Sequence, residues 1–460
     1  MLKKPRILIY IALIIGKNCV VSLRMSETRN IDVWSATSMV IANMVGTGVF
    51  TSLGYQLFDT QSGFALIMIW VVGGLVALTG AFSYAEIAGR LSKDGGEFHF
   101  LSEIFHPAIG YMAGFVSTTV GFAAPVAGAA LALGAYLHGV IPGVSGPLIG
   151  VLVIIALSFL HARSLSIGLL FQRISTLAKV LLMLAFILSG WYLGNKSQID
   201  FMPKVSAMDE IFDGLWFKAS FSVSLVWVSF AYSGWNAAAY IAGSIENPRR
   251  NLSRSILLGT LVVMVLYAAL NWVFLSSTPI EMMKGKKEVG LIAAQHIWGE
   301  NWGKFMGGVI SILLVSTISS MIFTGPRVLK TMLEKVPQLR YWSALNKYQI
   351  PLRSIWLQAF VSIVLLHVMD FESLIYYVAF TLSLFTLLTV LGLFILRIRG
   401  GKPEGYRAWG YPITPLIFLI MTASVCVFFI QMKPFESLMG FATGIVGLVF
   451  WYMSRSARSI

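Results

Sequence analysis

The sequence predicts an all-α polytopic membrane protein with twelve transmembrane helices. Three observations lead to this fold class. First, 57% of the 460 residues are hydrophobic and only 12% are charged, against roughly 25% charged in soluble domains. Second, the chain contains twelve apolar stretches, most of them close to the ~20 residues that cross a bilayer core. Third, Lys and Arg gather in every second connection between these stretches.

The twelve apolar stretches follow one another along the chain. The fourth and ninth are short for a full span, and flanking residues would complete them by snorkelling or by local thinning of the bilayer. The expected bounds are 33–57, 64–85, 108–137, 147–160, 174–193, 219–243, 255–276, 305–325, 354–369, 374–396, 411–431 and 437–453.

The positive charges predict the orientation. With both termini cytoplasmic, the inner segments hold 25 of the 34 Lys and Arg residues, the outer segments hold 8, and Lys179 falls within a span. This distribution follows the positive-inside rule and supports an even number of spans. We therefore expect a multi-pass protein of the plasma or inner membrane, and we explain the net charge of +14 by the bilayer rather than by nucleic acid.

The first 24 residues differ from the rest of the chain. Three basic residues precede the apolar run 7–15, as in a signal peptide, but no convincing cleavage site follows. We expect residues 1–24 to be a dispensable leader or the result of a start codon assigned too early. Residues 25–460 would then form one membrane domain.

Two of the predicted spans are interrupted near their middle. The first contains Gly46, Thr47 and Gly48, and the sixth contains Ser233 and Gly234. Either break alone is more readily explained by close helix packing. Matched breaks five spans apart instead point to a transport site between two inverted repeats. The repeats would be helices 1–5 (33–193) and helices 6–10 (219–396), with helices 11 and 12 (411–453) added.

Such breaks have a definite chemistry. Amides and carbonyls that are freed from a helix cannot face lipid, but they can line a cavity. Amides at the amino end of a half-helix attract a carboxylate, and carbonyls at a carboxyl end accept hydrogen bonds from an ammonium group. The two breaks together suit a small zwitterion.

Three motifs carry a resemblance to a known family. From Met25 nearly to the carboxyl terminus, the chain resembles the amino acid-polyamine-organocation (APC) permeases, and especially the L-type amino acid transporter branch. This resemblance implies the LeuT-like five-plus-five inverted repeat, with discontinuous helices 1 and 6 and transport by alternating access. The motifs are Gly46-Thr47-Gly48-Val49-Phe50, Tyr84-Ala85-Glu86 followed by Gly95-Gly96-Glu97, and Phe230-Ala231-Tyr232-Ser233-Gly234-Trp235-Asn236 running on to Glu246-Asn247-Pro248-Arg249-Arg250-Asn251.

The resemblance also implies the residues of the substrate site in the first span. There the substrate carboxylate would meet backbone groups of Val45, Gly46, Thr47 and Gly48.

In the sixth span, carbonyls near Phe230, Ala231 and Ser233 would hold the amine. Phe230 would close over the substrate as an aromatic gate, although a packing role is the simpler interpretation from sequence alone. Asn236 would brace the unwound segment. Ser233 stands where L-type members usually have glycine, which puts a large aromatic substrate in doubt.

Lys179 is the one Lys or Arg placed inside a predicted span. It could snorkel to the cytoplasmic interface from the start of the fifth helix. The resemblance instead implies a built-in cation where sodium-coupled relatives bind sodium. Lys179 then favours sodium-independent transport and a role in coupling or gating.

These features predict secondary active transport of small or neutral L-amino acids, by an exchanger (antiporter) or a proton-coupled symporter. Few carboxylates lie in the spans, which argues against cationic substrates. A channel or an amino acid sensor stays open as an alternative. A channel would favour a continuous polar pathway, and a sensor would usually have an added signalling domain.

An enzyme is not expected. Residues 143–146 superficially match an intramembrane serine protease motif, but prolines flank them in an outer loop, and the six histidines lie in loops or near span ends. The sequence shows no metal-ligand cluster and no phosphate-binding loop, so we expect no cofactor.

Cysteine usage predicts the partners. Eukaryotic L-type members are joined to a single-span glycoprotein through a cysteine in an outer loop. Here the connection between helices 3 and 4 has none, since the chain contains only Cys19 and Cys426. We therefore expect an amino acid substrate and the lipid bilayer as partners, and no disulfide-linked subunit.

Overall fold

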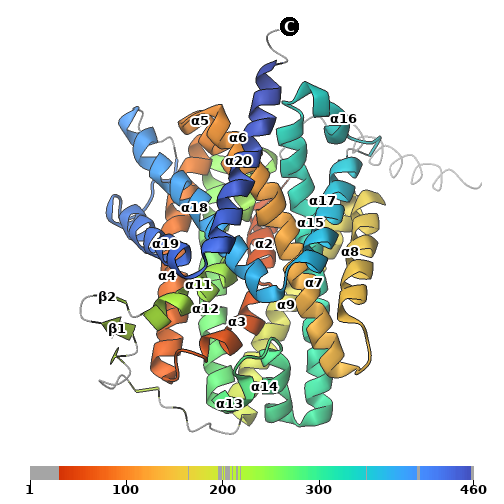
Figure 1. Ribbon diagram of the computed structural model, residues 1–460, viewed down its shortest axis with the longest axis vertical. Coiled ribbons are helices and arrows are strands. Elements are labelled where there is room, and N and C mark those ends of the chain that lie inside the picture. Colours follow the sequence, from red (N-terminus) through yellow and green to blue (C-terminus); the bar gives the residue numbers. More distant parts are fainter. Residues whose placement is uncertain are drawn as a thin grey trace, which may run out of the picture.

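The computed structural model is a bundle of helices (Figure 1). The predicted leader, residues 1–24, lies outside the residues that the structure describes. The described residues are 31–163, 165–194, 199, 201–202, 208–209, 211–213, 216–217, 219–348, 350–400 and 405–456.

Helices account for almost all of the described elements. In chain order they are α2 (Val33–Met44), α3 (Gly48–Gln56), α4 (Gly63–Arg90), α5 (Glu97–Ile104), α6 (Pro107–Val116), the π-helix η1 (Ser117–Ala123), α7 (Ala124–Val140), α8 (Gly146–Arg163), α9 (Leu165–Leu193), α11 (Ala219–Ala231), the 3₁₀-helix η2 (Ala237–Ser244), α12 (Pro248–Ser277), α13 (Ile280–Met283), α14 (Val289–Trp298), α15 (Glu300–Leu333), η3 (Pro337–Leu339), α16 (Arg340–Ser343), α17 (Leu352–Val368), α18 (Phe371–Ile398), α19 (Ile413–Met432) and α20 (Pro434–Ser456). A two-residue hairpin, β1 (Phe212–Asp213) and β2 (Trp216–Phe217), lies between α9 and α11.

The prediction of an all-helical membrane protein is confirmed at this level. Within the described residues, ten helices or helix pairs are long and apolar enough to cross a membrane. The two remaining predicted stretches are shorter helices: the ninth is α17, and the sixth is α11 followed by η2. Several helices extend beyond the expected spans, and α9, which begins at Leu165, starts well before residue 174.

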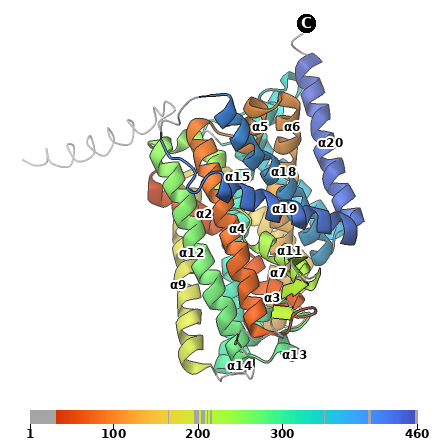
Figure 2. The ribbon, with the colours of Figure 1, turned by 90° about the vertical axis from the view of Figure 1, so that its left-hand side faces the viewer.

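The helices run roughly along one long axis. In Figure 2, α9, α12 and α4 lie side by side over much of the length of the molecule. Figure 1 places α5, α16 and the carboxyl end of α20 at one end, and α13 and α14 at the other. The first three of these segments, which are predicted to be inner, thus lie at one end, opposite the connection between α12 and α15, which is predicted to be outer.

The broken first span forms the centre of the bundle. Most side chains of α2 and α3 are buried, whereas α8, α9 and α20 expose large apolar side chains such as Phe159, Leu188 and Val449. Apolar side chains on the outside are suited to lipid. Irregular backbone at membrane depth is tolerated where the protein buries it, and the interrupted first span meets this condition.

A short backbone bridge joins the first span to the sixth. The amide of Ile31 donates to the carbonyl of Ser244 (3.1 Å), and the amide of Glu246 donates to the carbonyl of Ile31 (3.0 Å). The start of α2 and the end of η2 are thereby held together.

Candidate substrate site

The first span is interrupted at the predicted position. Helix α2 ends at Met44 and α3 begins at Gly48, so residues 45–47 connect two half-helices. The carbonyl of Val45 no longer bonds within the helix. It accepts hydrogen bonds from Lys179 Nζ (2.8 Å) and from Thr317 Oγ1 (3.1 Å).

The two glycines of this break allow close packing. A Cβ at Gly48 would overlap the Ala231 backbone, which is part of the sixth span. A Cβ at Gly46 would lie 3.2 Å from the methyl group of Thr317 on α15. Gly48 therefore permits direct backbone contact between the two broken spans, and Gly46 meets only the end of a side chain.

The sixth span is interrupted between α11, which ends at Ala231, and η2, which begins at Ala237. Gly234 has φ +94°, a conformation that side chains other than glycine rarely adopt. A Cβ there would lie 3.0 Å from the carbonyl of Asn43 on α2. Glycine is thus required both by the turn and by the close approach of α2.

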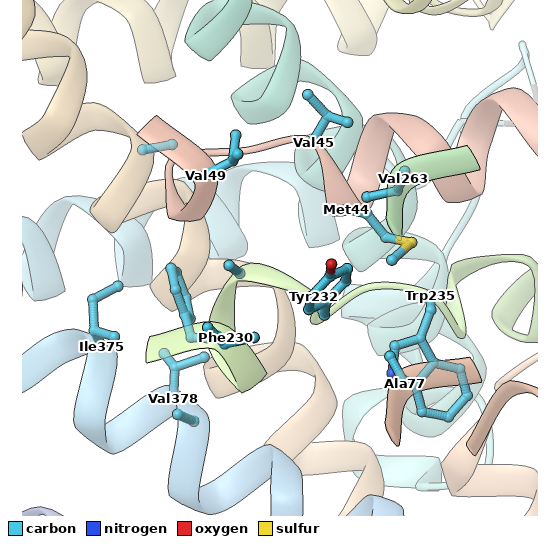
Figure 3. Close-up of a cluster of buried hydrophobic side chains, with 14 of the residues drawn as sticks. Met44, Val45, Val49, Ala77, Phe230, Tyr232, Trp235, Val263, Ile375 and Val378 are labelled. Atoms are coloured by element: carbon cyan, nitrogen blue, oxygen red, sulfur yellow. The ribbon is translucent and has the colours of Figure 1, made fainter. Parts of the chain in front are cut away.

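The two breaks face each other across the core. Figure 3 shows Met44, Val45 and Val49 on one side, with Phe230 and Tyr232 on the other. The fold thus brings together two breaks that lie far apart in the sequence.

A cavity of about 100 Å³ lies beside the break in the sixth span. This volume is large enough to hold several water molecules. The polar side chains that line it come from six elements and from the break itself: Asn43, Glu97, Ser229, Tyr232, Ser233, Asn236, Tyr240, Ser383, Thr386 and Thr422.

The predicted site residues divide into two groups. Phe230, Ser233 and Asn236 line the cavity. The other five predicted residues are buried but do not line the cavity: Ala231, Val45, Gly46, Thr47 and Gly48. In this conformation the backbone of the first break contacts Ala231, Lys179 and Thr317 rather than the cavity.

Lys179 lies in the interior rather than at an interface. It sits in the middle of α9, its side chain is fully buried, and its amino group donates to Ala42 O (3.3 Å), Val45 O (2.8 Å) and Thr317 Oγ1 (2.8 Å). The alternative in which it snorkels to the cytoplasmic interface is wrong for this conformation. The amino group instead connects α9 and α15 to the broken first span.

Asn43 is a cavity residue that the sequence analysis missed. Its Nδ2 donates to Met39 O (2.8 Å), while its Oδ1 is buried without a hydrogen-bond partner among the described residues. A buried amide oxygen without a donor is costly, by about 1–3 kcal/mol. A ligand with an N–H group in the cavity would relieve this cost. Its position two residues before the first break was the only available signal.

Glu97 is a second cavity residue that the sequence did not assign to the site, although it belongs to the Gly95-Gly96-Glu97 motif. Its side chain is buried and reaches the cavity. Tyr84 Oη donates to Oε1 (2.6 Å), Asn236 Nδ2 also donates to Oε1 (3.1 Å), and Ser117 Oγ donates to Oε2 (3.4 Å). Burial raises the pKa of this carboxyl to about 7, although these hydrogen bonds act in the opposite direction.

The position of Glu97 is fixed by a loop that docks on η2. Gly96 has φ +52°, and a Cβ there would collide with the ring of Tyr240. The amide of Gly95 donates to Tyr240 O (3.0 Å), and the amide of Gly243 donates to Asp94 Oδ1 (2.8 Å). The Gly-Gly-Glu motif thus turns the chain so that Glu97 points into the bundle.

A buried ion pair closes the end of the molecule that contains α5. Glu86 on α4 pairs with Arg397 on α18 and with Arg90 (2.7 Å), and it accepts the amide of Ala408 (2.8 Å). These contacts join α4, α18 and the segment before α19.

Comparison with known proteins identifies the class to which this fold and site belong. Residues 31–451 match the amino acid permease family, and the chain belongs to that family. Its members are permeases and not enzymes, as predicted.

Individual relatives are similar to this chain over most of its length. The serine/threonine exchanger SteT of Bacillus subtilis is 23% identical over 92% of this chain and 96% of its own length. The b(0,+)-type amino acid transporter 1 of Mus musculus is 24% identical over 93% of this chain and 88% of its own. The large neutral amino acids transporter small subunit 2 of Oryctolagus cuniculus is 25% identical over 92% and 80%, respectively.

Proposed function

We propose that this protein is a sodium-independent transporter that exchanges small neutral L-amino acids across a cell membrane by alternating access. The observation that carries the proposal is the cavity beside the break in the sixth span, which faces the break in the first span, in a chain of the amino acid permease family. Relatives named as a serine/threonine exchanger and as amino acid transporters support the substrate class.

The substrate would bind between the two breaks. Its ammonium group would meet carbonyls near Phe230, Ala231 and Ser233 together with the unpaired Oδ1 of Asn43. Its carboxylate would meet backbone amides at the amino end of α3, from Val45 to Gly48. Because α3 now packs against Ala231, binding requires the two broken spans to separate slightly.

The remaining architecture follows from the same proposal. Twelve spans, formed by two inverted repeats of five helices and two added helices, give each repeat one broken helix. The bias of Lys and Arg supports cytoplasmic termini. Lys179 would supply a fixed amino group beside the first break, where it takes contacts that a metal cation would otherwise make. We expect no disulfide-linked subunit, because the described residues contain a single, buried cysteine, Cys426.

Reconstitution in liposomes tests the proposal. Vesicles loaded with one amino acid should accelerate uptake of a second, labelled one from a panel of the common amino acids, with or without sodium. A channel would give flux without acceleration by the internal amino acid, and a sensor would bind without flux. Either result, or a strict requirement for sodium, would refute the proposal.

Substrate size provides a second test. Ser233 lines the cavity with a small side chain, so the larger side chain of Ser233→Leu should reduce the cavity volume available to a substrate. We expect exchange of larger neutral amino acids to fall at least tenfold more than exchange of alanine or serine. Ser424→Leu, a change at an exposed serine of α19, is the control and should leave the ranking unchanged. Equal losses of exchange for all substrates would show that the side chain of the substrate does not bind next to Ser233.

A further inference from the structure

The carboxyl group of Glu97 is the feature of the cavity that neutral amino acid exchange leaves unexplained. It is a buried carboxylic acid at the wall of the substrate cavity, and within the described part of the chain no Lys, Arg or His forms an ion pair with it. Its hydrogen-bond donors come from α4, from η1, from the break in the sixth span and from Tyr240 on η2.

We propose that Glu97 binds a proton at the wall of the cavity, and that binding of an amino acid substrate promotes this protonation. The substrate does so by drawing the side-chain amide of Asn236 away from the carboxyl group of Glu97. The inference rests on the proposed function, because it requires an amino acid in the cavity. It goes beyond that function by assigning a second bound species, H⁺, to a named group.

The physical basis is competition for the amide of Asn236. In the structure this amide donates to Glu97 Oε1 (3.1 Å) while the same residue lines the cavity. A ligand that draws the amide of Asn236 away from Glu97 removes one of the donors that stabilise the ionised carboxyl. Loss of a hydrogen bond to the charged form favours protonation. One proton from solvent then adds to the carboxylate, and no other bond forms or breaks.

The charged residues around Glu97 have other partners, so the carboxyl group can gain or lose a proton without breaking an ion pair. Burial already brings its pKa to about 7, into the physiological range. The titratable groups that face it are the hydroxyls of Tyr84 on α4 and Tyr240 on η2. Charged residues on the neighbouring elements have other partners: His99 with Glu103 on α5, Arg90 and Arg397 with Glu86, and Arg327 and Lys330 near Asp94.

The linkage has a definite sign. If substrate binding takes up a proton, then affinity is highest when Glu97 is already protonated and falls as the pH rises through its pKa. For a free-state pKa of about 7 and a rise of about 1.5 units on loss of one charged hydrogen bond, the Kd should increase roughly fivefold to tenfold between pH 6 and pH 8. A neutral amino acid keeps the same charge over this interval.

The experiment is calorimetric titration of the purified full-length protein at pH 6, 7 and 8. The probe is L-serine, or the neutral amino acid that exchanges fastest in the liposome assay. At pH 7.5, titration in two buffers of different ionisation enthalpy gives the number of protons taken up per substrate. Glu97→Gln mimics the protonated form and should show a Kd independent of pH with no proton uptake. Glu103→Gln, an exposed position on the same helix, should behave as the wild type.

The outcomes separate this inference from the proposed function. Proton uptake in the wild type that is lost in Glu97→Gln supports the inference. Binding without proton uptake, or the same pH dependence in both proteins, overturns it and leaves amino acid exchange intact. Tighter binding of L-lysine than of neutral amino acids, with proton release, also overturns it and would assign Glu97 to a cationic side chain. Absence of binding and exchange for all amino acids would instead refute the proposed function.

A further variant applies if Glu97→Gln does not fold. Tyr84→Phe removes one donor to the same carboxyl, which should raise its pKa and move the loss of affinity to higher pH. An unchanged pH profile in this variant would overturn the inference.

Discussion

At the scale of single residues, Lys179 makes the most consequential contacts of the first break. Its amino group donates to two main-chain carbonyls of the first span and to Thr317, without a carboxylate nearby in the contacts that the structure describes. Carbonyls released by a broken helix must be satisfied inside the membrane. The amino group satisfies them and also joins α9 to the break.

We predict that Lys179→Met slows exchange at least tenfold while changing substrate Kd by less than threefold. Methionine retains the apolar stem but donates no hydrogen bond, so the break is less well held as the spans separate and return. Exchange rate and Kd are measured separately in liposomes and in detergent. A large loss of affinity with a normal rate would instead make Lys179 part of the binding surface.

The glycines of the first break should differ from one another in their response to substitution. A methyl group at Gly48 would collide with main-chain atoms of Ala231, which cannot move independently, whereas one at Gly46 meets the movable methyl group of Thr317 at 3.2 Å. We predict that Gly48→Ala lowers stability by ~1–3 kcal/mol, as overpacking does, and that Gly46→Ala lowers it by less than 1 kcal/mol.

Thermal unfolding in detergent and substrate affinity of the folded fraction together test this order. Near-normal affinity in folded protein with bulky residues at both positions would show that these glycines serve helix packing alone. The substrate carboxylate would then bind elsewhere.

At the scale of elements, the buried pair between Glu86 and Arg397 connects α4 to α18. We predict that Arg397→Ala costs ~2–3 kcal/mol of stability, because it leaves a buried carboxylate with fewer partners. The same change in a Glu86→Gln background should cost clearly less, since no charge is left unpaired. Unfolding midpoints of the wild type, both single variants and the double variant measure this coupling, and additive effects would mean that the pair contributes nothing.

The elements also show how far the sequence could predict the structure. The breaks at Gly46–Gly48 and at Gly234 were predictable, since glycine is a local signal with a known conformational effect. The position of Glu97 was not, because a docking contact between residues 95 and 240 turns it inward. Contacts of Lys179 with Thr317 are equally non-local, and periodicity along one helix cannot reveal them. The early start of α9 escaped notice because Arg173 interrupts its apolar run.

At the scale of the whole molecule, the charge bias predicts which end faces the cytoplasm. We predict that a cysteine placed at Lys433, between α19 and α20, is labelled from outside intact cells by a membrane-impermeant maleimide. One placed at Arg455, near the end of α20, should be labelled only after permeabilisation. The background protein carries Cys19→Ser and Cys426→Ser. Reversed labelling would invert the proposed orientation.

The bridge between Ile31 and the segment 244–246 has a mechanical consequence. The bridge joins the start of α2 to the end of η2. The loop 94–96 also docks on η2, so hydrogen bonds hold these three segments together as one unit. Hinged movement needs flexible joints only at its boundaries. The two broken spans provide such joints at residues 45–47 and 232–236. This unit can therefore move as one body about both breaks, and its motion carries with it the loop that precedes Glu97.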